Sequence, residues 1–172
     1  EDRRDSLPSQ KIIPKYSNNL TGKVRIVLAG SAGQKIRSAA SIFSRAAILS
    51  GLYAAQKDDY PITIMTGYSI AEIILDRNPI LYTGIETPDL VIILSGDGLN
   101  RIKDRLNLIK NGTMIFIDDT LGDQLNIEFR DNIYRIPVQN WVEAKEVGKK
   151  NLALVALGYL LNKTQLFPID AV

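Results

Sequence analysis

Short apolar runs alternate with amphipathic stretches along this sequence. The runs at residues 24–29, 90–94 and 113–117 are continuous enough to be buried strands covered on both faces. After the first run, apolar residues from Ile36 to Ala47 recur at helical spacing, and Gly51 follows where such a helix would end. Strands that alternate with helices predict an α/β fold: a three-layer Rossmann-like domain with a mostly parallel sheet and helices on both faces.

More local signals define the other elements. Residues 60–75 alternate around Gly67 and are rich in β-branched side chains, so we expect two extended pieces hinged at that glycine. Asp97 can cap a helix that ends at residues 111–112. Residues 134–137 predict a short edge strand.

The last part of the sequence has helical character. Asn140 and Glu143 have the spacing of a capping box for a helix through Val147. A further helical face follows, with apolar positions from Leu152 to Leu160. We therefore expect helices after the last strand.

The pattern divides the chain into two parts. Residues 1–21 carry charge, prolines and paired asparagines without a sustained period, which is typical of an arm or linker. Residues 22–172 are long enough for one α/β domain with its own core, and we expect that domain to be truncated at its C-terminus. The charged first residues, with no Met at the start, indicate a processed or excised piece of a cytoplasmic protein.

Composition removes several kinds of chemistry. The sequence has no Cys and no His, which excludes a thiolate or imidazole zinc site, cysteine-ligated clusters and histidine-based triads. The formal net charge is +2, and basic residues alternate with acids, so no basic stripe points to nucleic acid or to a membrane. Catalysis would need carboxylates, Lys, Tyr or a bound cofactor.

The glycine-bracketed turn after the first strand is the main candidate site. Gly30, Ser31, Ala32 and Gly33 can present backbone N–H groups and a hydroxyl to a phosphate or carboxylate at the helix that begins near Gln34. The turn lacks the full dinucleotide spacing and a Walker lysine. A tight strand-to-helix turn with no ligand is an equal alternative, because such a turn needs glycine in any case.

Two further places could carry chemistry. Thr66 and Gly67 can let a ligand or another backbone approach closely, although a glycine inside a strand pattern more often marks a simple bulge. Asp118 and Asp119 follow a buried strand and could hold Mg²⁺, but paired acids there more often cap or turn the chain. We therefore predict no metal site.

The order of these motifs resembles the gamma subunit or gamma domain of thiamine-diphosphate-dependent 2-oxoacid:ferredoxin oxidoreductases. The resemblance covers residues 23–161. Two positions depart from the family pattern: Lys35 stands where the family has the last glycine of the turn, and Met65 replaces an arginine. The motifs that carry the resemblance are Gly30-Ser31-Ala32-Gly33-Gln34-Lys35, Ala39-Ala40, Ala46-Ala47, Gly51, Tyr60, Met65-Thr66-Gly67, Pro79-Ile80, Pro88-Asp89, Ile136-Pro137, Ala144, Gly148, Asn151 and Leu157-Gly158.

The resemblance implies a part of an enzyme that is inert alone. The enzyme would convert a 2-oxoacid to acyl-coenzyme A and CO2, with thiamine diphosphate and iron–sulfur clusters held by alpha and beta partners and electrons passed to ferredoxin. It implies that this chain binds no cofactor tightly but lies close to where coenzyme A enters, with residues 30–34, Thr66 and Gly67 as its binding residues.

Two other classes stay open at this point. A free-standing nucleotide- or anion-binding module would use the same turn, and its dinucleotide form would need an acid at the tip of the second strand, where Asp58 and Asp59 come somewhat late. An assembly scaffold without a ligand is the third hypothesis.

Overall fold

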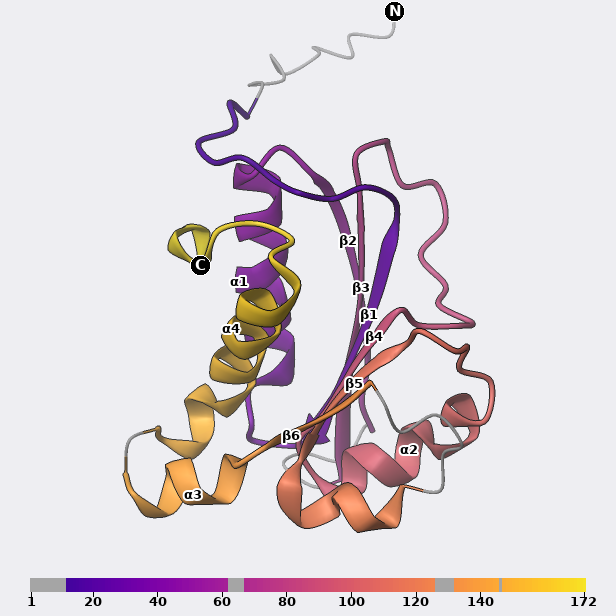
Figure 1. Ribbon diagram of the computed structural model, residues 1–172, viewed down its shortest axis with the longest axis vertical. Helices are drawn as coiled ribbons and strands as arrows, with labels where there is room; N and C mark the ends of the chain where they lie inside the picture. The colour runs from indigo at the N-terminus through magenta and orange to yellow at the C-terminus, as the bar shows by residue number, and fades with distance from the viewer. Residues whose placement is uncertain (1–11, 62–66, 126–131, 146) are drawn as a thin grey trace, which may run out of the picture.

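The computed structural model describes residues 12–61, 67–125, 132–145 and 147–172. They form a three-layer α/β domain, with α1 and α4 on one face of the sheet and α2 on the other (Figure 1). The strands are β1 (Val24–Ser31), β2 (Tyr53–Asp59), β3 (Tyr68–Asp76), β4 (Leu90–Ile93), β5 (Met114–Asp118) and β6 (Ile133–Ile136). The α-helices are α1 (Ile36–Leu49), α2 (Gly96–Leu106), α3 (Val138–Glu143) and α4 (Leu152–Thr164), with short 3₁₀ turns η1 (Asp119–Gln124), η2 (Lys149–Asn151) and η3 (Ile169–Ala171).

The sheet has the order β2-β3-β1-β4-β5-β6. The pairings β1–β4, β4–β5 and β5–β6 are parallel, whereas β3 pairs antiparallel with both β1 and β2. Five strands therefore run in one direction and β3 alone runs against them. The predicted α/β class, with its mostly parallel sheet and helices on both faces, is confirmed, and so is the edge position of β6.

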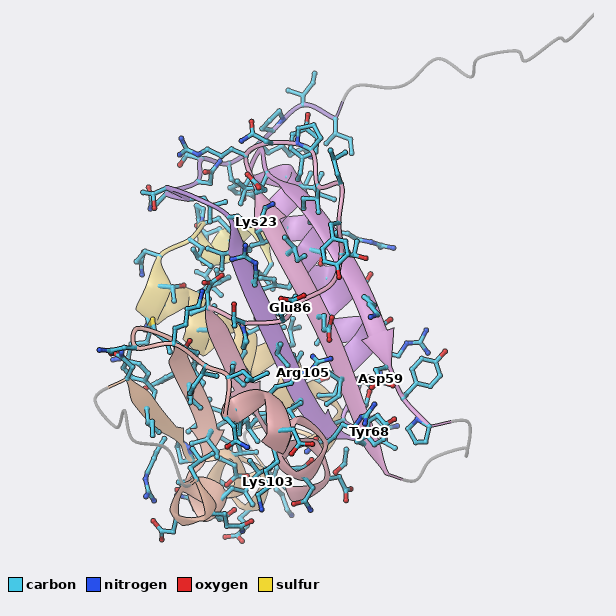
Figure 2. The ribbon with its side chains drawn as sticks, turned by 90° about the vertical axis from the view of Figure 1, so that its right-hand side faces the viewer. Lys23, Asp59, Tyr68, Glu86, Lys103 and Arg105 are labelled. Atoms are coloured by element: carbon cyan, nitrogen blue, oxygen red, sulfur yellow. The ribbon has the colours of Figure 1, made fainter. Side chains whose placement is uncertain are left out.

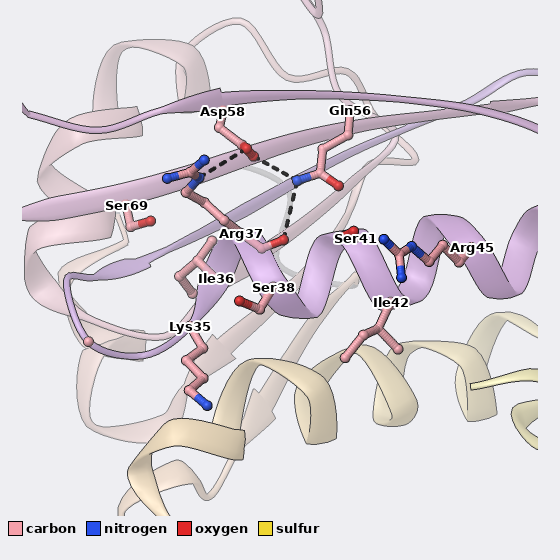
Figure 3. Close-up of a pocket in the computed structure, with 11 residues that line it drawn as sticks. Lys35, Ile36, Arg37, Ser38, Ser41, Ile42, Arg45, Gln56, Asp58 and Ser69 are labelled. Atoms are coloured by element: carbon pink, nitrogen blue, oxygen red, sulfur yellow. Dashed lines mark hydrogen bonds and ion pairs between the residues drawn. The ribbon is translucent and has the colours of Figure 1, made fainter.

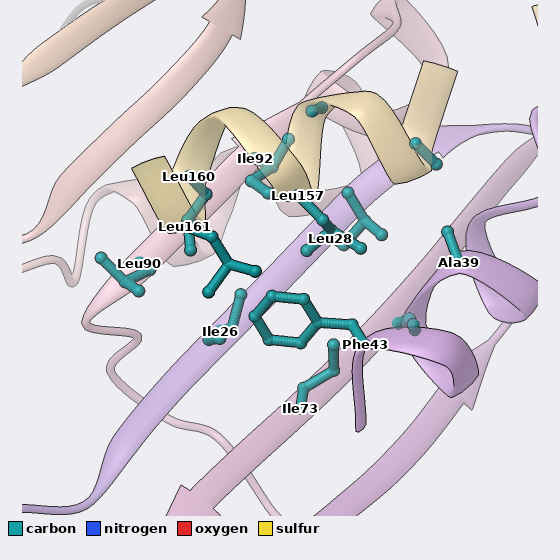
Figure 4. Packing of buried hydrophobic residues seen from close by; sticks show 14 of the residues in the cluster. Ile26, Leu28, Ala39, Phe43, Ile73, Leu90, Ile92, Leu157, Leu160 and Leu161 are labelled. Carbon is teal, nitrogen blue, oxygen red and sulfur yellow. The ribbon is translucent and has the colours of Figure 1, made fainter. Parts of the chain in front are cut away.

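A large apolar core fills the space between the sheet and the helices α1 and α4. Phe43 of α1 is fully buried in it, beside residues of β1, β3 and α4, and its ring centroid lies 5.0 Å from that of Phe167 (Figure 4). A smaller core lies under α2, where Leu99 and Ile102 pack on the opposite face of the sheet. Burial of these side chains from water is the main force that holds the three layers together.

The expected N-terminal caps of α2 and α3 need correction. Helix α2 is capped by Ser95, whose hydroxyl accepts a hydrogen bond from the N–H of Gly98, while Asp97 lies in the first turn. The predicted cap failed because Ser95 has the same capping chemistry two residues earlier. Gly67 does precede a strand, β3, whereas residues 62–66, most of the other predicted extended piece, lie outside the described residues.

The proposed capping box in α3 is also wrong. Helix α3 begins at Val138, directly after Pro137, and ends at Glu143, so Asn140 lies inside the helix. Proline before the first turn starts the helix without a side-chain cap, because its φ is already close to the helical value.

The segment before β1 contributes to the core, which corrects the expectation that residues 1–21 stay outside it. Leu20 is buried, and Asn19 donates its backbone N–H to the carbonyl of Leu166 at 2.9 Å. Residues 1–11 lie outside the described residues, so an arm there stays a prediction. None of the helices in the described ranges is both long and apolar enough to cross a membrane.

Candidate functional site

The site is built at the edge of the sheet where the five codirectional strands end. The turn after β1, the start of α2 after β4 and the end of β2 all lie there, beside the start of the reversed strand β3. In open α/β sheets this edge is where ligands bind. Its polar groups therefore decide what the domain can do.

Most hydrogen-bonding groups of the glycine turn are occupied within the protein. The N–H of Ser31 donates to Oε1 of Gln34 at 2.8 Å, and the N–H of Ala32 donates to the carbonyl of Gly67 at 2.8 Å. The Ser31 hydroxyl donates to Oδ2 of Asp97 at 2.8 Å. The Gln34 side chain therefore occupies the place where an anion would meet the Ser31 amide.

The two glycines that meet at the turn have a packing role. A Cβ on Gly98 would lie 2.6 Å from the nitrogen of Gly30 and 2.7 Å from the carbonyl carbon of Ala29. A Cβ on Gly30 would lie 2.5 Å from Gln34 Oε1 and 2.6 Å from Ile36 Cδ1. Glycine is needed at position 98 because the backbone of α2 passes directly over the end of β1, whereas at position 30 the obstacles are the side chains of Gln34 and Ile36.

Lys35 is the residue that separates the turn from α1. Its φ of 53° and ψ of 35° place it in the left-handed region, which disfavours residues with a Cβ by roughly 1–2 kcal/mol. It is also the position at which the sequence has lysine in place of the glycine of the resembled pattern. Lys35 makes no side-chain cap for α1, so the first-turn amides of α1 have no side-chain acceptor within the part of the chain that the structure describes.

A groove of about 770 Å³ opens beside Lys35 and runs along the exposed side of α1 (Figure 3). Lys35, Arg37 and Arg45 give it three cationic side chains, against the single carboxylate of Asp58. Arg37 Nε lies 3.2 Å from Asp58 Oδ2, which leaves the groove with an excess of positive charge. The remaining lining comes from Gly33, Ile36, Ser38, Ser41, Ile42, Gln56 and Ser69.

Helix α2 is tied to β2 and β3 by arginines. Arg101 Nη2 lies 2.7 Å from Asp59 Oδ2, and this carboxylate raises the pKa of Arg101 above its ordinary value through its hydrogen bond and its charge. The Arg101 guanidinium also lies 4.7 Å from the centroid of the Tyr68 ring, and Figure 2 shows Tyr68 and Asp59 near each other. Arg105 forms an ion pair with Glu72, which is buried in the sheet under α2.

Sequence reasoning missed these links for an identifiable reason. Glu72 is a lone acid in an apolar strand, and only the fold shows that Arg105 reaches it. The second carboxylate oxygen of Glu72 is buried without a hydrogen-bond partner among the described residues. The sequence signal that could have predicted this ion pair was a charged residue inside an otherwise apolar strand.

Asp118 has the capping role that the sequence favoured over metal binding. Its Oδ1 accepts hydrogen bonds from the N–H and the hydroxyl of Thr120, at 3.0 and 2.8 Å, and so caps η1. In the described ranges, no three acidic side chains converge in a way that could hold a metal ion.

The candidate binding residues thus fall into two groups. The structure brings Gly30, Ser31, Ala32, Gly33 and Gln34 together with Gly67, while Thr66 lies outside the described residues. The cationic groove beside them was not predicted. Its side chains can bind an anion, because arginine and lysine supply charge-assisted hydrogen bonds to phosphate and carboxylate.

Comparison with known proteins assigns the chain to a family. Residues 25–172 match the family model of pyruvate ferredoxin/flavodoxin oxidoreductases. The chain belongs to this family. The match confirms the relationship indicated by the motif order.

Curated relatives point to the same kind of enzyme. The chain is 30% identical to the 2-oxoglutarate synthase subunit KorC of Methanothermobacter marburgensis, over 85% of this chain and 80% of the relative. It is 28% identical to the KorC subunit of Methanothermobacter thermautotrophicus, over 71% of this chain. The match spans 58% of the length of that second relative.

Solved structures share the fold. The keto/oxoacid ferredoxin oxidoreductase gamma subunit of Geobacter sulfurreducens aligns with a TM-score of 0.68 and 21% identity, over 87% of this chain and 81% of the other. A chain of the 2-oxoglutarate:ferredoxin oxidoreductase of Magnetococcus marinus aligns with a TM-score of 0.73 and 21% identity, over 88% of this chain and 26% of the other. That structure contains 2-oxoglutarate, coenzyme A and succinyl-CoA.

Proposed function

We propose that this chain is the gamma-type component of a 2-oxoacid:ferredoxin oxidoreductase and is inert without its partners. The observation that carries the proposal is the family match over residues 25–172, together with a fold shared with a gamma subunit. In the assembled enzyme, a 2-oxoacid is decarboxylated and oxidised, its acyl group passes to coenzyme A, and the electrons pass to ferredoxin. With this role goes a cytoplasmic location, which fractionation of source cells would test.

The chemistry of oxidation belongs to the partner chains in this proposal. Thiamine diphosphate and iron–sulfur clusters supply the decarboxylation and electron transfer when bound, and alpha and beta subunits hold them. This chain has no Cys to ligate a cluster. The proposed contribution of this chain is to bind coenzyme A and to orient it.

The groove is where we place that contribution. Coenzyme A carries phosphate groups, and the Lys35 end of the groove offers an ammonium that forms no ion pair among the described residues, next to the first turn of α1, where the helix dipole also favours anions. The glycine turn holds this end in place through Gln34 and Asp97. Residues 30–34 and Gly67 thus shape the site, and Lys35 contacts the anion, whereas Arg37 is paired with Asp58.

The dinucleotide-binding alternative fits the fold less well. It would need an acid at the tip of a strand beside β1, but β2 lies at the far edge and is separated from β1 by β3. Asp58 and Asp59 are paired with Arg37 and Arg101. Neither carboxylate is therefore free for a ribose.

The experiment is to purify this protein with its natural partners and to follow methyl viologen reduction by 2-oxoacids with coenzyme A and thiamine diphosphate. We expect activity with one 2-oxoacid, and Lys35→Glu should raise KM for coenzyme A about tenfold or more at unchanged KM for the 2-oxoacid. Lys103→Glu makes the same charge change on α2, and its KM values should not change. Purification without such an activity, with nucleotide bound to the isolated chain, would refute the proposal.

A further inference from the structure

The outer edge of β2 is an unpaired sheet edge. Strand β2 pairs only with β3, and no other strand of the described chain lies on its far side. Figure 2 shows β2 at the right-hand border of the sheet, with Asp59 at its end. Seven residues long, β2 exposes more edge than the four-residue β6 on the opposite side. Such a row of free N–H and C=O groups can pair with an additional strand.

The ion pairs at this edge leave it positively charged. Both carboxylates at the end of β2 are occupied, Asp58 by Arg37 at 3.2 Å and Asp59 by Arg101 at 2.7 Å. Lys57 and Arg45 are exposed and form no ion pair among the described residues. The unneutralised charges of the edge are therefore cations.

These cations lie on opposite faces of the sheet. Lys57 is aligned with Glu72 across the β2–β3 ladder, so its side chain is on the face covered by α2. Arg45 lies on the α1 side, in the same groove as Gln56. An added strand would lie about 4.8 Å from β2, and its successive side chains would also alternate between the two faces of the sheet. Acidic residues on either face would meet a cation.

We propose that an extended, acidic segment of another polypeptide adds to the outer edge of β2 as a seventh strand. Backbone hydrogen bonds to β2 hold the segment, and its carboxylates pair with Arg45 on one face and Lys57 on the other. Tyr53 and Tyr60, each 50% exposed, flank the edge and give apolar contact at both ends. A second copy of this chain fits worse, because its own β2 would bring Lys57 and Arg45 toward their equivalents.

The test uses the full chain, labelled with 15N, and two blocked heptapeptides. One alternates glutamate with valine and threonine, and the other has lysine in place of each glutamate. We expect the acidic peptide to slow amide hydrogen exchange at alternate residues of β2, those whose N–H groups face outward, and to shift their resonances. The basic peptide should do neither, because it brings like charges to the edge.

Charge-reversal variants connect the binding to the named side chains. Lys57→Glu combined with Arg45→Glu should weaken acidic-peptide binding about tenfold, since each opposite-charge pair across a ladder contributes modestly. Lys57→Gln alone should give a smaller loss and guards against a folding defect in the double variant. Lys103→Glu, on the outer side of α2, is the matched control and should leave binding unchanged.

Several results would overturn the proposal. No shift in β2 at about 1 mM acidic peptide, or equal binding of both peptides, rules out an acidic strand partner. Exchange protection of the outer β2 amides that rises with protein concentration in the absence of peptide identifies a second copy instead. None of these readouts depends on oxidoreductase activity, so they are independent of the proposed function.

Discussion

The contact between α2 and the end of β1 can be tested by adding one methyl group. In Gly98→Ala the new Cβ would lie 2.7 Å from the carbonyl carbon of Ala29, whereas favourable carbon contacts begin near about 3.5 Å. Because the obstacle is backbone, α2 would have to move outward by about 0.8 Å. Such overpacking costs about 1–3 kcal/mol, and the shift also weakens the Ser31–Asp97 hydrogen bond by about 1 kcal/mol. A helix-propensity gain of about 1 kcal/mol offsets part of this loss.

We therefore expect Gly98→Ala to lower the free energy of unfolding by about 2 kcal/mol. Gly96→Ala is the matched control, because a Cβ there meets nothing within 4 Å; without a clash it should be as stable as the wild type or more stable by up to about 1 kcal/mol. Urea titration followed by circular dichroism and by the single Trp measures both variants, and unchanged m values would show that the unfolding transition is the same. Equal stability of the two variants would refute the packing argument for the turn.

Three further predictions concern strain, the buried ion pair and pH. Lys35→Gly should raise the free energy of unfolding by about 0.5–1 kcal/mol in thermal or urea unfolding, because glycine adopts the left-handed conformation freely; a loss of stability would contradict this. Arg105→Leu should cost about 3 kcal/mol by leaving the Glu72 carboxylate buried without its partner, and adding Glu72→Met should recover most of the loss in the same assay. The backbone N–H of Asn78, and then Lys23, lower the pKa of Asp76 below its ordinary 3.8, so its stabilising effect is complete above that pH and is lost as the pH falls through the lowered value. Asp76→Asn should remove this part of the acid-induced loss in urea titrations between about pH 5 and pH 2, and an unchanged acid limb would argue against it.

The sequence pattern predicted the layers of this fold better than its strand directions. The run before Gly30 and the helical spacing after it correctly gave β1, the turn and α1. The reversed direction of β3 could not be predicted, because an apolar strand buried on both faces reads the same in either direction. Strand β2 was considered only in the dinucleotide hypothesis, since it is a polar edge strand whose charged residues, such as Lys57 and Asp58, lack the expected apolar alternation.

The candidate site was half predictable for a related reason. A turn is local, so the glycines and Gln34 could be found from spacing alone. The groove depends on which helix face remains uncovered after packing, and the pairing of Asp58 with Arg37 is visible only in three dimensions. Charges that are far apart in the sequence cancel or accumulate only once the fold brings them together.

The structure also changes the role that we assign to the glycine turn. Its amides and hydroxyl bind Gln34, Gly67 and Asp97, so the turn acts as a scaffold between β1, β3 and α2. In the proposed function the binding role moves one residue further, to Lys35, an exposed side chain that lines one end of the positively charged groove. A lysine in place of the glycine costs backbone strain but adds a positive charge at the site. This charge gives a physical reason to keep a strained residue there. If so, Lys35→Gly should stabilise the protein and weaken coenzyme A binding in the assembled enzyme, whereas a gain in stability with unchanged KM for coenzyme A would show that the strain has no binding role.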